Sequence, residues 1–480
     1  MTTPETSPPE GDAAPQDRAR EARQVARAVI GCFLASGAIG LIYEVLWIRM
    51  LGLVFGHTVF AVTTVLASFM GGLGLGGLVF GRIADRARSP VRLYGLLEIG
   101  IGLYCLALPV LLSGAAGIYL WVSRTLDPPF LVFSLVQFAL VALLLIPPTF
   151  LMGATLPVLV RFFAREERTL GRQVGLLYSV NTWGAVAGVL LAGYFLVPSL
   201  GIQTTLRMAV VANVGLGALL LVFDRHLRRL ASDLAAAEPA APPEGPKTPG
   251  DQPEPVSDLA RVLVAAGFAA SGAASMIYEV TWTRALTLSI GSSTYAFSAM
   301  LAAFLSGIAG GSWLFALLAG RRRLRPEAFA WLQLAIGGSV LALVPAFERL
   351  PLWFLTAFQF SQDPGYIQTL QFGLSVAVML APTLLIGATF PCAVRILAQG
   401  MGRVGSDTGW IYAVNTAGSI LGVSAAGFLG VPALGIQWTM RIGIGLNLAV
   451  GAAILLCGGG RSTLRRTLGL AAAAAAAAAA

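Results

Sequence analysis

The chain has 480 residues, of which 56% are hydrophobic and only 11% are charged. Soluble globular domains carry about 25% charged residues, so this composition excludes a soluble protein and indicates one that crosses a membrane many times. The net charge of +9 comes almost entirely from arginine, since Lys247 is the only lysine. Because the arginines gather at the ends of apolar stretches, they indicate membrane topology, and no nucleic-acid partner is expected. The two histidines and four cysteines form no metal-binding pattern, so neither a metal nor a cofactor is predicted.

Twelve stretches are long and apolar enough to cross a bilayer, which takes about 20 helical residues. They form two sets of six, separated by a segment at 231–257 that is rich in Ala, Pro, Glu and Asp and is typical of a flexible linker. We therefore predict an all-α polytopic membrane protein. The stretches lie near 28–55, 58–81, 92–122, 130–160, 172–198, 203–223, 262–290, 293–319, 326–346, 367–397, 408–433 and 437–457.

Clusters of arginine follow the second, fourth and sixth stretch of each set, as Arg82, Arg86 and Arg88 do in the first set. All clusters fall on one side of the bilayer if both termini are cytoplasmic. We expect a multi-pass protein of the bacterial inner membrane in that orientation. Its predicted parts are a disordered cytoplasmic N-terminus at 1–27, a first six-helix repeat at 28–230, a cytoplasmic linker at 231–257, a second repeat at 258–460, and a basic and then poly-alanine tail at 461–480.

The two halves repeat each other in sequence. Tyr43-Glu44-Val45 returns 235 residues later as Tyr278-Glu279-Val280, and the Gly-Ala-Thr-Leu-Pro motif at 153–157 returns 234 residues later as Gly-Ala-Thr-Phe-Pro. Six helices per half is an even number, so both halves would have the same orientation in the membrane. This predicts twelve transmembrane helices in two parallel six-helix repeats, a major-facilitator-like arrangement whose substrate site lies near mid-membrane between the halves.

Glu44 and Glu279 are the strongest candidate functional residues. A carboxylate inside a spanning helix is costly, so it usually faces a polar interior or a water-filled cavity and has a partner. As equivalent residues of the two repeats, they are candidates for attracting a cationic substrate. The alternative is that each forms a structural ion pair with a nearby arginine, for which Arg49 and Arg284 are available. Glu98 has no acidic counterpart in the second half.

Four further polar residues are candidates for lining the same cavity: Tyr43, Tyr278, Asn181 and Asn415. Each occupies an equivalent position in the two halves. Inside a membrane helix such groups either line a cavity or form hydrogen bonds between helices, and the sequence leaves both interpretations open.

A third group of residues is typical of gating or structural roles. Asp85 and Arg86 lie in the segment Gly-Arg-Ile-Ala-Asp-Arg-Ala-Arg at 81–88, which resembles the cytoplasmic signature of major-facilitator proteins, where such charges hold one face closed. Pro148 and Pro382 are expected to kink the fourth and tenth helices, because proline removes a backbone donor. The glycine-rich run at 71–77 favours close helix packing over a phosphate-binding loop.

The segments at 36–58, 151–162 and 175–201 resemble the membrane portion of bacterial fused major-facilitator/spermidine-synthase-like proteins, and the segment from 271 onward resembles the same portion again. In that family a soluble aminopropyltransferase domain normally follows the membrane region. We expect none after residue 460 of this sequence, where the two interpretations are a natural low-complexity tail and a truncated synthase. No catalytic residue can be carried over, and no enzymatic activity is expected from this chain.

The resemblance and the paired glutamates together predict a transporter-like membrane protein. It would handle a cationic amine or polyamine by alternating access of its two halves. The alternative is a non-transporting membrane subunit or scaffold, with a protein partner that supplies a soluble domain.

Overall fold

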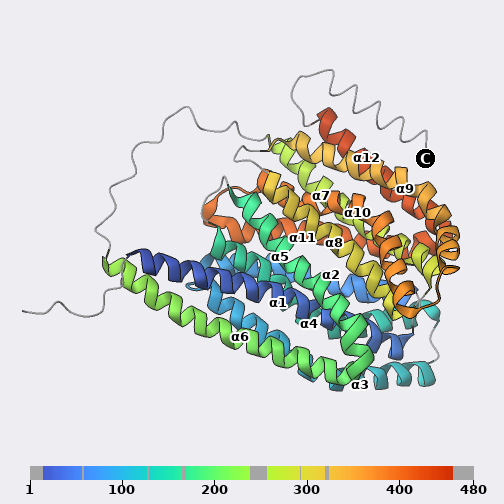
Figure 1. The fold of residues 1–480 in the computed structure, drawn as a ribbon, viewed down its shortest axis with the longest axis horizontal. Coiled ribbons are helices and arrows are strands. Elements are labelled where there is room, and N and C mark those ends of the chain that lie inside the picture. The colour runs from blue at the N-terminus through green and yellow to red at the C-terminus, as the bar shows by residue number, and fades with distance from the viewer. Residues whose placement is uncertain are drawn as a thin grey trace, which may run out of the picture.

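The computed structural model describes residues 15–56, 59–126, 129–164, 169–237, 257–291, 293–318 and 324–457. All regular elements in these ranges are helices, and they run largely along one common direction (Figure 1). The first half contains α1 (Pro15–Phe55), α2 (Val59–Arg86), α3 (Pro90–Leu126), α4 (Phe130–Phe163), α5 (Leu170–Leu190), the π-helix η2 (Leu191–Leu196) and α6 (Val197–Ala237). The second half contains α7 (Asp258–Ile290), α8 (Thr294–Leu318), α9 (Pro326–Phe358), α10 (Pro364–Leu397), the 3-10 helix η4 (Met401–Arg403), α11 (Val404–Ser424), the π-helix η5 (Ala425–Leu434) and α12 (Gly435–Cys457).

Ten continuous helical segments of the described residues are long and apolar enough to cross a membrane. Two of them, 170–226 and 401–457, contain 57 residues each. An unbroken α-helix of that length would extend about 85 Å, far more than the roughly 30 Å of a bilayer core. Both segments contain a break, because Gly201 and Gly435 adopt positive φ angles of 76° and 81° after the π-helical stretches η2 and η5. Glycine adopts this conformation without the steric cost that a Cβ would impose.

The helices of each half pack mainly among themselves, and a few helices join the halves. In the first half α1 packs on α5, α2 on α4, and α3 on α6, and in the second half the corresponding pairs are α7 with α11, α8 with α10, and α9 with α12. The halves meet mainly where α2 packs on α11 and α5 packs on α8. In Figure 1 the first half, coloured blue to green, lies below the yellow-to-red second half, and these four helices lie between them.

Glycines allow the helix backbones at this junction to come close together. A Cβ on Gly77 of α2 would lie 2.9 Å from the Tyr412 ring of α11, and one on Gly409 of α11 would lie 2.1 Å from the Gly77 carbonyl oxygen. The predicted packing role of the glycine run at 71–77 is confirmed, since the whole run lies within α2 and contacts α4 and α11.

The N-terminal boundary differs from the prediction. We expected residues 1–27 to lack structure, but α1 begins at Pro15. The segment from Asp17 to Arg27 is rich in Ala, Arg, Glu and Gln, which are strong helix formers, so the helix extends beyond its apolar part. Residues 1–14, most of the predicted linker (238–256) and the tail from residue 458 onward lie outside the described residues.

Candidate functional site

A pocket lies between the two halves and contains both predicted glutamates. Its empty volume is about 510 Å³, a figure that includes the open mouth, and about 50 Å³ of it is accessible to water-sized molecules. Helices α1 and α2 of the first half and α7 and α8 of the second half contribute its walls, so neither half forms it alone. The lining residues are Glu44, Ile48, Val62, Thr63, Leu66, Glu279, Val280, Thr283, Arg284, Phe297 and Leu301.

The two carboxylates face this pocket without a protein partner. Glu44 is 7% exposed and Glu279 is half-buried. Within the described part of the chain, neither side chain forms a hydrogen bond or an ion pair. The two carboxylates interact electrostatically with each other. The alternative of a structural ion pair with Arg49 or Arg284 is therefore not formed here. Such unpaired carboxylates are available to a ligand.

Arg284 also lines the pocket, one turn of α7 beyond Val280. With both glutamates ionised, these three charged groups sum to −1, from two negative charges and one positive charge. The remaining walls are mostly aliphatic or aromatic, with the hydroxyl groups of Thr63 and Thr283 as additional polar contacts. This charge and lining suit an organic cation better than an anion.

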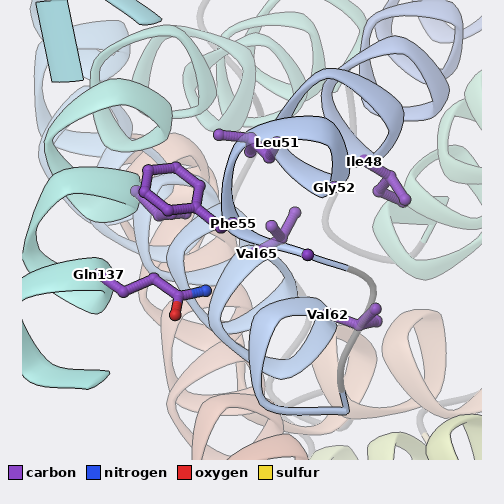
Figure 2. A pocket seen from close by; sticks show the side chains of 9 residues that line it. Ile48, Leu51, Gly52, Phe55, Val62, Val65 and Gln137 are labelled. Atoms are coloured by element: carbon purple, nitrogen blue, oxygen red, sulfur yellow. The ribbon is translucent and has the colours of Figure 1, made fainter. Parts of the chain in front are cut away.

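A smaller pocket of about 280 Å³ adjoins the first one and shares Ile48 and Val62 with it. It lies among α1, α2 and α4 (Figure 2), and its other labelled walls are mainly apolar. Gln137 of α4 extends into it, and its amide nitrogen is buried without a hydrogen-bond partner. Ile48 and Val62 thus lie between the glutamate pocket and this mainly apolar pocket. Among the described lining residues of the second pocket, the Gln137 amide nitrogen is the one buried polar atom without a hydrogen-bond partner.

At the opposite end of α2, Asp85 joins the two halves. One carboxylate oxygen accepts from the Gly405 backbone N–H at 2.8 Å, and the other accepts from the Ser406 N–H at 2.8 Å and the Ser406 hydroxyl at 2.5 Å. The residue that precedes α11, Arg403, makes no side-chain cap. Asp85 therefore caps the N-terminus of a helix in the other half, which satisfies donors that have no partner within α11.

The glutamate pocket and this cap lie at opposite ends of the interface between the halves. Thr63 in the pocket wall and Asp85 are 22 residues apart on α2, which corresponds to about 33 Å along the helix axis. The bundle is thus closed by direct contacts at the Asp85 end and hollow near the other end. Arg86, next to Asp85, is exposed.

The four other predicted substrate residues do not line the glutamate pocket. Tyr43 and Tyr278 are fully buried, and the Tyr278 hydroxyl donates to the side-chain oxygen of Asn447 at 2.7 Å. The Asn415 amide donates to the Phe268 carbonyl at 2.9 Å, which joins α11 to α7. Asn181 lies in the equivalent contact of the first half, where α5 packs on α1 at Gly37. The contacts of Tyr278 and Asn415 match the helix-to-helix interpretation that the sequence left open, whereas the Tyr43 hydroxyl is buried without such a hydrogen bond.

The remaining predicted structural residues lie within helices, and the kinks expected at the two prolines stay predictions. Pro148 and Pro382 are buried inside α4 and α10. Thr149 and Thr383, which follow them, donate their hydroxyls to the carbonyl groups four residues earlier, both at 2.6 Å. Arg49 is half-buried and does not line the glutamate pocket.

The sequence interpretation missed two buried polar clusters, one in each half. In the first, Glu98 of α3 accepts from Ser36 of α1 at 2.6 Å and from the Asn213 side chain of α6 at 3.0 Å. In the second, Gln333 of α9 donates to Ser271 of α7 at 3.0 Å and accepts from the Asn447 side chain of α12 at 2.6 Å. These six residues correspond at the 234- or 235-residue repeat spacing. That spacing, applied to every polar residue in the apolar stretches, would have identified them.

Comparisons with known proteins agree with the helical architecture. No protein-family model matches the chain, and no curated protein matches it in sequence. A bacterial homologue of the iron transporter ferroportin in its outward-facing state superposes with a TM-score of 0.55 at 14% identity, over 90% of this chain and 98% of that one. The human organic anion transporter MFSD10 (TETRAN) superposes with a TM-score of 0.50 at 16% identity, over 92% and 99% of the two chains. The major facilitator superfamily transporter FucP in its outward conformation has a TM-score of 0.46 at 14% identity, over 89% and 96%. The first two matches cover nearly the whole of both chains, and the chain is a multi-pass helical membrane protein whose fold is similar to the folds of those two transporters.

Proposed function

We propose that this chain is an integral membrane transporter that carries a cationic amine by alternating access of its two halves. The observation that carries the proposal is the pocket between the halves in which Glu44 and Glu279, one from each half, have no hydrogen-bond or ion-pair partner among the described residues. A charged group in a membrane interior without a partner is costly unless it faces water or a ligand. A substrate cation supplies the missing partner.

The arrangement of the two ends supports alternating access. Asp85 closes one end by capping α11 across the interface, while the pocket lies about 33 Å away along α2. Rocking of the halves about the pocket would break the Asp85 contacts and expose the glutamates to the other side. With cytoplasmic termini, as the arginine clusters predict, Asp85 lies on the cytoplasmic side and the pocket lies toward the outside.

The proposal includes twelve membrane crossings in two parallel six-helix repeats. It is supported by the breaks at Gly201 and Gly435, which divide the two longest helical segments, and by the matching helix pairs of the two halves. The 234- and 235-residue sequence spacing relates the same elements. The bacterial inner membrane remains the proposed location.

The substrate class follows from the lining of the pocket. Two carboxylates and one guanidinium leave one net negative charge, which matches an organic monocation or a longer amine that places only part of its charge between the glutamates. The resemblance to spermidine-synthase-like membrane proteins makes diamines and polyamines the first compounds to test. A membrane subunit that serves a synthase in trans remains the alternative function.

The test is binding and uptake by the purified full chain in proteoliposomes. The amine panel comprises a monoamine, a diamine and a triamine, and an organic anion serves as the negative compound. Replacing either glutamate with glutamine (Glu44→Gln, Glu279→Gln) should weaken amine binding at least about 10-fold, equivalent to about 1.4 kcal/mol. The double variant should abolish saturable uptake.

The matched control is Glu348→Gln, which removes an exposed carboxylate of α9 that does not line the pocket. It should bind and transport like the parent. Unchanged uptake by the double glutamate variant would refute the role of these carboxylates. If the parent shows no uptake of any panel compound and copurifies from native membranes with a stoichiometric partner, the subunit alternative is correct instead.

A further inference from the structure

Glu98 is a carboxylate buried in the first half, and its repeat counterpart is a neutral amide. It is 1% exposed and is the ninth residue of α3, where it lies between α1 and α6. The equivalent position in α9 is Gln333, which is fully buried between α7 and α12. The same fold therefore holds a carboxylate and a carboxamide in corresponding clusters.

The hydrogen-bond directions in the two clusters differ in one respect. Gln333 donates to the Ser271 hydroxyl and accepts from the Asn447 amide. Glu98 accepts from the Ser36 hydroxyl and from the Asn213 amide, and it also interacts with the hydroxyl of Tyr94, whose counterpart in the second half is Phe329. A carboxylic acid has one O–H donor and one carbonyl acceptor, so a protonated Glu98 matches the pattern of Gln333 after rotation of a single serine hydroxyl. In the neutral form the Tyr94 hydroxyl keeps the Cys32 carbonyl, 3.5 Å away, as an acceptor.

The charge of Glu98 is not compensated by a neighbouring cation. The ionisable groups whose charges interact with it are Cys32 and Tyr43 from α1 and Tyr94 from α3. The α6 neighbour Asn213 is neutral, and no ionisable group of α4, the third helix packed on α3, interacts with Glu98 among the described residues. An ionised carboxylate at this depth depends on neutral hydrogen-bond donors alone, whereas binding a proton removes the charge.

A second asymmetry involves the neighbouring tyrosines. In the second half the cluster continues from Asn447 to the Tyr278 hydroxyl at 2.7 Å. In the first half the hydroxyl of the corresponding Tyr43 forms no hydrogen bond to Asn213 and interacts with the Cys105 thiol, while the Asn213 amide also donates to the Glu98 backbone carbonyl. The first cluster therefore lacks the tyrosine–asparagine hydrogen bond of the second cluster. If the Asn213 side chain changed its hydrogen bonds, the Tyr43 hydroxyl could donate to it in the same way. Tyr43 precedes Glu44, so this rearrangement would take place beside the substrate pocket.

We propose that Glu98, with Ser36 and Asn213, is a reversible proton-binding site within the first half. The proton comes from water and binds a carboxylate oxygen, the Ser36 hydroxyl turns from donor to acceptor, and the cluster takes the hydrogen-bond order of Gln333, Ser271 and Asn447. The second half holds the permanently neutral version and binds no proton. This site is independent of the substrate, so it can be tested whether or not the proposed transport function is correct.

The test is infrared difference spectroscopy of the full chain in lipid between about pH 4 and about pH 9, a range that spans carboxyl titration in proteins. We expect the carboxylic acid C=O signal of the parent to lose one component in Glu98→Gln. That variant should fold with a thermal midpoint within about 3 °C of the parent, because the second half already accommodates the amide. In the reciprocal variant Gln333→Glu a new titrating carboxyl component should appear.

Several outcomes would overturn the proposal. One is a titrating carboxyl signal that is identical in the parent and in Glu98→Gln. Another is a Glu98→Gln protein that fails to fold, since the neutral form would then not satisfy the cluster. A third is a carboxyl component that responds to sodium at constant pH, which would identify a metal-cation site instead.

Discussion

Removal of the Asp85 carboxylate should loosen the closed end of the interface between the halves. Asp85→Ala removes the carboxylate with which α2 caps the N-terminus of α11. That carboxylate accepts from two backbone N–H groups at 2.8 Å and from the Ser406 hydroxyl at 2.5 Å. Loss of a helix cap costs about 0.5–2 kcal/mol, and net hydrogen bonds to charged groups contribute about 1.5–3 kcal/mol. Since Asp85 is only half-buried, we expect a total of about 2–4 kcal/mol. That free energy corresponds to a shift of about 30-fold to about 700-fold in the opening equilibrium.

The assay uses a cysteine reporter in the contact itself. Ala84 is fully buried on α2, and its Cβ would lie 3.3 Å from a Cβ on Gly405 of α11. Ala84→Cys in a Cys457→Ser background, which removes an exposed thiol, should react with a maleimide only when this end opens. Its labelling rate reports the open fraction even when that fraction is small, provided that reclosing is faster than labelling.

The matched control for this prediction is Asp407→Ala. Asp407 also accepts a backbone N–H, from Gln399 at 2.7 Å, but this bond stays within the second half. We expect its removal to change the labelling rate of the reporter by less than about 3-fold, equivalent to less than about 0.7 kcal/mol. Equal labelling rates in the parent and in Asp85→Ala would refute the reasoning that Asp85 holds this end closed.

Two further predictions concern glycines. In Gly418→Ala the new Cβ would lie 1.8 Å from the Ala269 carbonyl oxygen, where α11 packs on α7. Its free energy of unfolding should therefore fall by about 1–3 kcal/mol through overpacking. The control is Gly445→Ala, whose new Cβ meets nothing within 4 Å, and it should be at least as stable as the parent. Gly435→Ala should cost about 1–3 kcal/mol, because the combination of φ 81° and ψ 173° is essentially restricted to glycine. Unfolding in mixed detergent micelles measures all three variants, and a Gly418→Ala protein as stable as Gly445→Ala would contradict the close packing of α7 and α11.

The sequence alone predicted the membrane class, the helical stretches and the candidate pair Glu44 and Glu279. These properties are local or periodic. A run of about 20 apolar residues can satisfy its backbone in lipid only as a helix, and an intramembrane carboxylate is conspicuous in such a run. The N-terminal boundary was misjudged, because the helix continues through a polar segment on propensity alone.

The roles of individual polar residues depended on the tertiary structure. Whether Glu44 meets Glu279 or an arginine depends on how α1, α2, α7 and α8 pack, and spacing along the chain does not determine which side chains share a cavity. The structure places both glutamates in one pocket, while Tyr278 and Asn415 form contacts between helices instead. The role of Asp85 as a cap on α11 likewise joins residues more than 300 positions apart.

The sequence therefore shows which charged residues lie within apolar stretches. The tertiary structure decides which groups those residues contact. Sequence periodicity determines which residues belong to a membrane helix, because the cost of an exposed backbone in lipid applies to every segment separately. The rotation and pairing of the helices depend on small contacts such as those of Gly77 and Gly409, which act between segments distant in sequence. Only that packing decides that two glutamates share a pocket and that the side chains of Ser36 and Asn213 reach Glu98.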